Sequence, residues 1–131
     1  MDIMFQDSQA DLLPPESVRI LKLKVDPFPD GKRVRLMVEL TPFQKKPSGD
    51  IFITNQENEI VTSASFIEAI TSKFDMTLHL RSHQPGLYIA KLTLFYISEI
   101  EDQDRNGELF IQPEKKVVDE MKEDFRLITD L

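Results

Sequence analysis

The strongest constraint on the fold of this chain is the alternation of apolar and polar side chains along several short segments. Every second residue from Val34 to Leu40 is a large aliphatic residue, and the same two-residue period recurs from Phe74 to Leu80. This period puts alternate side chains on opposite faces of a strand, so each segment predicts a strand that is buried on one face. The chain is therefore predicted to be built from β-strands.

Proline, glycine and asparagine between the apolar segments supply turns, which separate six predicted strands. These strands are expected at residues 18–25, 33–41, 51–54, 59–66, 74–81 and 87–96. Residues 66–71 have the apolar spacing for one short helical turn. Residues 117–128 fit both a strand and a helix, and we favour a seventh strand because an antiparallel sandwich needs one to complete its sheet.

The length of 131 residues matches one domain with one hydrophobic core. Residues 1–16, with prolines at 14 and 15, are expected to form a flexible N-terminal arm. Residues 17–131 are expected to form the sandwich domain.

A local motif narrows the fold. The segment Pro85-Gly86-Leu87-Tyr88-Ile89-Ala90 resembles the start of the sixth strand of immunoglobulin-like domains, with Ala90 where the disulfide cysteine would be. The resemblance implies an all-β, antiparallel, two-sheet immunoglobulin-like sandwich of about seven strands. It also implies that the Tyr88 ring packs in the core with its hydroxyl bonded to nearby backbone. The cysteine pair and the third-strand tryptophan are missing, so the resemblance is one of fold, which carries no function with it.

Composition bears on compartment and partners. The chain has no cysteine, no Asn-x-Ser/Thr sequon and no long apolar run, which predicts a cytoplasmic protein without membrane contact. Its net charge of -7 argues against a nucleic-acid partner, because phosphate binding relies on a basic surface. The acidity is concentrated at the C-terminal end, where residues 99–131 carry 11 acidic and five basic side chains.

One segment resembles a cation site. Asp102, Asp104, Asn106 and Glu108 put oxygen atoms at alternate positions around Gly107, as the first part of an EF-hand calcium loop does. The twelfth position is Pro113 instead of glutamate, and the flanking residues do not read as helices. The other interpretation, which we favour, is a turn at the tip of an acidic hairpin.

The sequence offers little for catalysis. His79 and His83 are predicted on a strand and in the following turn, and no serine stands in a nucleophile motif. We therefore expect no enzymatic activity.

Surface patterning is more informative than the motifs. If Tyr88 and Leu92 point into the core, Leu87, Ile89 and Phe95 point outward and form an apolar stripe, which Phe52 on the third strand would extend. An exposed stripe of this kind indicates a protein contact, unless residues 97–116 fold back over it. The immunoglobulin-like resemblance implies that the first, second and fifth strands share the opposite sheet, which would then expose a mostly basic face. The predicted function is a protein–protein interaction module, either a homodimer or docked to a larger protein; the alternative is a calcium- or ligand-responsive sandwich that uses loop 102–108.

Overall fold

The computed structural model describes residues 11–82, 84–103 and 106–128. Within these ranges the chain contains no α-helix, and its one named helical element is a 3-10 turn at Pro15–Ser17. The all-β prediction with seven strands is confirmed. The strands are β1 (Ile20–Pro27), β2 (Arg33–Leu40), β3 (Ser48–Thr54), β4 (Ile60–Phe66), β5 (Lys73–His79), β6 (Gly86–Gln103) and β7 (Leu109–Leu127).

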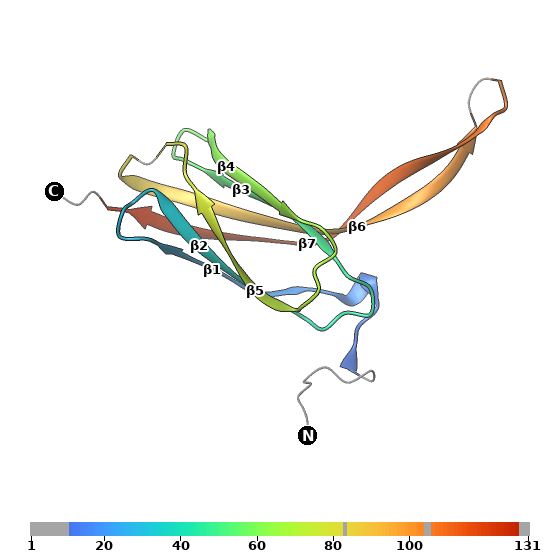
Figure 1. Cartoon of the computed structure of the whole chain (residues 1–131), viewed down its shortest axis with the longest axis horizontal. Coiled ribbons are helices and arrows are strands. Elements are labelled where there is room, and N and C mark those ends of the chain that lie inside the picture. The colour runs from blue at the N-terminus through green and yellow to red at the C-terminus, as the bar shows by residue number, and fades with distance from the viewer. Residues whose placement is uncertain (1–10, 83, 104–105, 129–131) are drawn as a thin grey trace.

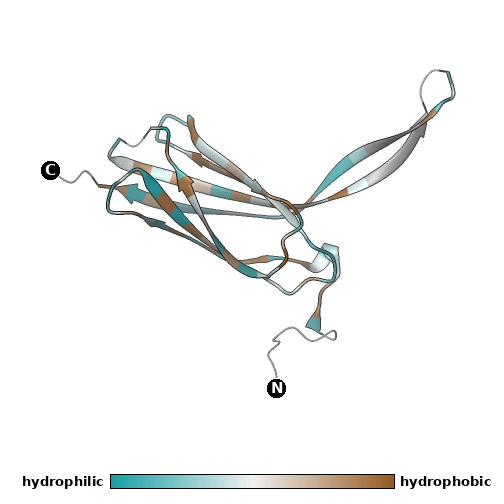
Figure 2. Ribbon diagram, viewed as in Figure 1, coloured by the Kyte–Doolittle hydropathy of each residue, from teal (hydrophilic) through white to brown (hydrophobic). Residues whose placement is uncertain are grey.

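The strands form two antiparallel sheets that pack face to face (Figure 1). One sheet has the order β1-β2-β5 and the other the order β4-β3-β6-β7. The predicted division is confirmed, since the first, second and fifth strands share a sheet and the third, sixth and seventh share the other. β4 joins the larger sheet by pairing with β3. Figure 2 shows apolar and polar residues alternating along the strands, as the two-residue period requires.

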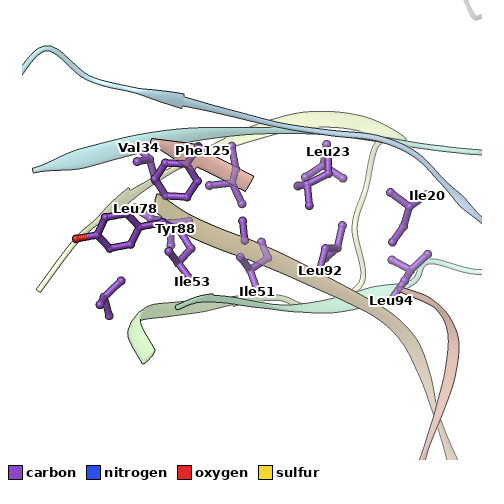
Figure 3. Packing of buried hydrophobic residues seen from close by; sticks show 14 of the residues in the cluster. Ile20, Leu23, Val34, Ile51, Ile53, Leu78, Tyr88, Leu92, Leu94 and Phe125 are labelled. Atoms are coloured by element: carbon purple, nitrogen blue, oxygen red, sulfur yellow. The ribbon is translucent and has the colours of Figure 1, made fainter. Parts of the chain in front are cut away.

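The core lies between the two sheets and is filled by aliphatic side chains from both, among them Leu36, Ile51 and Leu92, which have no exposed surface (Figure 3). Tyr88 and Phe125 stack beside each other at one end of this core, with ring centroids 5.5 Å apart. Because inward positions on both sheets are apolar at every second residue, the alternation in the sequence is the direct cause of this core.

The predicted helical turn at residues 66–71 is absent. The chain bends there instead, and Glu68 has a positive φ of 50°. Two hydrogen bonds hold the bend against the start of β3. The backbone N–H of Glu68 donates to Ser48 Oγ (3.0 Å), and the backbone N–H of Ala69 donates to the carbonyl of Pro47 (2.8 Å). A segment this short has too few internal bonds to favour a helix over such tertiary contacts.

Residues 117–127, left between strand and helix by their spacing, belong to strand β7, so the favoured prediction is confirmed. The described backbone of residues 97–103 and 106–116 does not fold back over the larger sheet. There β6 and β7 continue together beyond the sandwich as a projecting two-stranded hairpin (Figure 1). We call its paired part, residues 97–103 of β6 and 109–115 of β7, the ribbon.

The segment before β1 is attached to the sandwich from residue 12 onward. The backbone N–H of Leu13 donates to Pro42 (3.3 Å), and that of Gln44 donates to Leu13 (2.9 Å). Leu13 also packs against the core. The expected flexible arm, residues 1–16, is therefore held to the domain over its last residues, while residues 1–10 lie outside the described ranges.

Candidate interaction surface

Three of the exposed large apolar side chains of the β4-β3-β6-β7 sheet lie near one another on its outer face. Phe52 on β3 and Ile89 on β6 are each 39% exposed, and Ile60 on β4 is 51% exposed. We call these three residues the outer patch. Two of them, Phe52 and Ile89, were predicted interface residues.

Strand register brings the outer patch together. Thr54 on β3 pairs with Ile60 on one side and with Ile89 on the other, which sets these three side chains in one row across the sheet. Phe52 lies in the next row, where it pairs with Lys91. Diagonal neighbours on one face of an antiparallel pair lie within reach of aromatic side chains, so Phe52 and Ile89 form a continuous surface.

Leu87 and Phe95, the other two predicted interface residues, are less exposed than the residues of the outer patch. Leu87 is half-buried at the start of β6, where it pairs with Arg126. Phe95 was predicted to be exposed, and it is only 5% exposed. The reason is local: the β6–β7 pairing shifts register between Leu94 and Phe95, and the ammonium group of Lys115 lies over the Phe95 ring, 4.2 Å from its centroid.

Lys115 is fixed in that position by an ion pair. Its Nζ donates to Asp50 Oδ2 at 2.8 Å, and Ser65 Oγ donates to Asp50 Oδ1 at 2.7 Å. The hydrogen bond from Lys115 lowers the pKa of the Asp50 carboxyl below its usual 3.8, and the bond from Ser65 adds to the effect. Lys115 therefore covers Phe95, whereas Val117, which pairs with Phe95 on β7, is 55% exposed.

Charged residues also border the outer patch along β7. Asp124 pairs with Ile89, and Lys91 forms an ion pair with Glu120 at 3.3 Å. The surface is thus an apolar centre on β3, β4 and β6 with an ionic margin, a composition typical of protein contacts.

Sequence reasoning missed Ile60. The segment 59–66 alternates weakly, because Thr62 and Ala64 stand on its inner side instead of large aliphatic residues. Only the pairing with Thr54 shows that Ile60 shares a row with Ile89.

On the opposite face, the β1-β2-β5 sheet, two of the basic side chains are paired with carboxylates. Arg35 on β2 is paired with Asp75 on β5 by a 2.6 Å contact, and Arg33 with Asp30 by a 3.0 Å contact. A shallow hollow of about 320 Å³ lies on this face. Acidic and basic side chains both line it: Lys22, Arg35, Glu39, Lys73 and Asp75.

The predicted cation loop is the turn of the β6–β7 hairpin. Asp102 lies near the end of β6, Asn106 and Glu108 are exposed in the turn, and Gly107 has a positive φ of 82°. Asp104 lies outside the described residues. Strands flank the loop where an EF-hand has helices, and no group of three metal-ligating side chains occurs among the described residues. Calcium binding here stays a prediction.

Two tyrosines anchor loops to the larger sheet. The hydroxyl of Tyr88 donates to the carbonyl of Gln84 at 2.6 Å, and that of Tyr96 donates to the carbonyl of Lys45 at 2.8 Å. Burial raises the pKa of Tyr88, and it raises that of Tyr96 to about 12. The predicted core position and backbone bond of Tyr88 are confirmed. His79 is exposed at the end of β5, and its predicted partner in a histidine pair, His83, lies outside the described residues.

Comparisons with known proteins leave the family open. No protein-family model matches the chain, and no curated protein matches it. Solved structures of a β-glucuronidase from Ruminococcus gnavus are similar at 15% identity. The complex with D-glucuronic acid has a TM-score of 0.46 and the apo structure a TM-score of 0.43, each with 86% of this chain aligned. This chain covers only 16% of the length of those chains, and likeness at this level carries no functional information.

None of the helical segments in the described ranges has the length and apolar character required to cross a bilayer.

Proposed function

We propose that this chain is a non-enzymatic protein–protein interaction module, which associates with a second copy of itself through the outer patch. The single observation behind the proposal is the row of Ile60, Thr54 and Ile89 beside Phe52, which leaves three large apolar side chains exposed on one sheet face. Scattered exposed apolar residues need no explanation, but a contiguous group with a charged margin is typical of contact surfaces.

We further propose that the sandwich is immunoglobulin-like and that the protein is cytoplasmic. The sheet orders β1-β2-β5 and β4-β3-β6-β7 support the first statement. So does the hydrogen bond from the Tyr88 hydroxyl to a carbonyl four residues upstream, which is the pattern of a tyrosine corner. The absence of cysteine from the sequence supports the second.

The outer patch is small for an interface, and this sets the expected strength. Specific interfaces bury about 800 Å² on each partner, and apolar burial contributes about 25 cal/mol per Å². Three partly exposed side chains supply only part of that area, so the ionic margin must also be buried. We therefore expect a weak dimer that forms at high protein concentration.

Charge gives the expected dependence on salt. Each copy carries a net charge of -7, so two copies repel each other as they come into contact. Added salt screens the repulsion between the two copies, since the Debye length falls from about 10 Å at 0.1 M to about 3 Å at 1 M. Association should strengthen with salt.

Light scattering over a concentration series tests the proposal. The wild type should pass from monomer to dimer, and Ile89→Glu should stay monomeric and folded by circular dichroism. Thr77→Glu is the matched control, because Thr77 is an exposed strand residue on the opposite sheet. A wild type that remains monomeric at every protein and salt concentration would refute self-association. An equal loss of dimer in both variants would show that the outer patch is not the interface.

A further inference from the structure

The ribbon leaves one long strand edge without a partner. β3 pairs with β6 only from Ile89 to Phe95, whereas β7 pairs with the other edge of β6 as far as Gln103. No strand in the described ranges pairs with the β3-side edge of residues 97–103. We infer that this edge is a docking site for an extended, basic segment of a partner protein, which binds as an added β-strand.

The backbone of this edge suits strand addition. The sequence from Ile97 to Gln103 contains no proline, so every residue has a backbone N–H and a carbonyl, and those of alternate residues point to the edge away from β7. A row of unpaired N–H and C=O groups is a template for another strand. A two-stranded ribbon is also marginally stable in water, and a third strand would stabilise it.

A preformed groove lies where the added strand would meet the sandwich. It has a volume of about 320 Å³, near the lower limit of known ligand pockets. Ile97 at its ribbon side is 51% exposed, and Ile67 in the β4–β5 loop is 79% exposed. The groove is lined by Lys45, Lys46, Ser48, Ile67, Glu68, Tyr96, Ile97 and Pro113.

The walls of the groove are held in place by bonds to the sandwich. The Tyr96 hydroxyl holds the backbone at Lys45, and the N–H groups of Glu68 and Ala69 bind the start of β3. A fixed groove loses little conformational freedom on binding, which favours affinity. It therefore suits one large apolar side chain at the end of the partner strand.

The position of the groove gives the direction of the partner. β3 begins at Ser48, opposite Phe95, and runs antiparallel to β6. A partner antiparallel to β6 would lie in line with β3 and run toward it. Its C-terminal end would then reach the groove, while its preceding residues pair along the ribbon.

The charge of the edge selects the partner. Residues 97–103 include Glu99, Glu101 and Asp102 and no basic residue. Like charges on neighbouring strands are destabilising, so the same edge of a second copy is a poor partner. Residues 1–10 of this chain, with Asp2 and Asp7 and no base, are excluded on the same grounds. Lysine and arginine at alternate positions of a strand from another protein would complement the negative charge of residues 97–103.

A peptide titration of the full chain tests the inference. The probe is a synthetic nine-residue peptide of alternating lysine and valine with a phenylalanine near its amidated C-terminus. Nuclear magnetic resonance should show amide shifts for residues 97–103 and for Ile67, and hydrogen exchange along 97–103 should slow at least tenfold. Two matched peptides, one with glutamate for lysine and one N-methylated at alternate amides, should not bind.

Two variants of the protein separate strand addition from general attraction. Glu101→Lys, on the β6 edge, should weaken peptide binding at least fivefold. Glu114→Lys makes the same change of charge on β7, where Glu114 pairs with Ser98, and should weaken it less than twofold. Equal loss in both variants, or binding of the N-methylated peptide, would overturn the inference. Ile89→Glu should leave peptide binding unchanged, so self-association through the outer patch and strand addition at the ribbon are tested independently.

Discussion

The strands β6 and β7 run through both the sandwich and the ribbon, but among the described strands a second sheet faces them only within the sandwich. Within the sandwich, β6 lies between β3 and β7 and buries Leu92 and Leu94 against the other sheet. In the ribbon, β6 has β7 as its one partner among the described strands, and Ile97 is half exposed. The β6–β7 pairing runs through both regions, so they differ in the third strand beside β6 and in burial by a second sheet, and for both reasons we expect the sandwich to be the more stable part of the molecule.

The largest effect should come from the end of the core. Tyr88→Ala removes a ring that is buried, stacks on Phe125 and bonds to Gln84, and should lower the free energy of unfolding by about 3–5 kcal/mol in urea denaturation. Tyr88→Phe is the control, since it removes only the hydrogen bond and should cost about 0.5–1.5 kcal/mol. A loss below about 1 kcal/mol for Tyr88→Ala would mean that the ring does not support the core.

Two truncations on β6 test the comparison directly. Leu92→Ala, in the sandwich, should lower the free energy of unfolding by about 2–5 kcal/mol because it leaves a cavity. Ile97→Ala, in the ribbon, should cost less than about 1 kcal/mol because the side chain is half exposed. The same denaturation experiment measures both. A similar decrease in the free energy of unfolding for both variants would show that side chains in the ribbon and in the sandwich contribute equally to stability.

A smaller effect should appear at the boundary, where Asp50 holds Lys115 over Phe95. The pKa of Asp50 is lower in the folded chain than its usual 3.8, so the ionised carboxylate stabilises the fold above about pH 4. That stabilisation is lost as the pH falls through the lowered pKa. Asp50→Asn should therefore cost up to about 1 kcal/mol at pH 7, as measured for exposed pairs, and the difference from wild type should shrink in acid. A difference that does not change with pH would exclude the ion pair as its cause.

The strands could be predicted from the sequence, because the positions of Val34, Leu36 and Val38 settle which face is buried, and the division between sheets was predicted from the resemblance to immunoglobulin-like domains. The immunoglobulin-like motif around Tyr88 predicted the hydrogen bond from the Tyr88 hydroxyl to the backbone. The burial of Phe95 under Lys115 could not be predicted. Lys115 lies 20 residues away in the sequence, and only the register of the β6–β7 pairing brings it over the Phe95 ring.

The ribbon could not be predicted either. The predicted sixth strand ends at residue 96, because the apolar residues that follow, Ile97 and Ile100, are three apart and do not continue the two-residue period. The sequence predicted a hairpin turn at Asn106 and Gly107, but it did not predict how many residues pair on each side of the turn.

The most direct test of self-association uses isoleucine methyl groups as reporters in nuclear magnetic resonance spectra over a protein concentration series. Ile60 and Ile89 lie in the outer patch, whereas Ile70 and Ile128 are exposed elsewhere and serve as controls. The proposed dimer predicts that the Ile60 and Ile89 methyl signals shift with concentration, more strongly in added salt, while those of Ile70 and Ile128 stay constant. Signals of Ile60 and Ile89 that do not move, or that move no more than the controls, would contradict association through the outer patch.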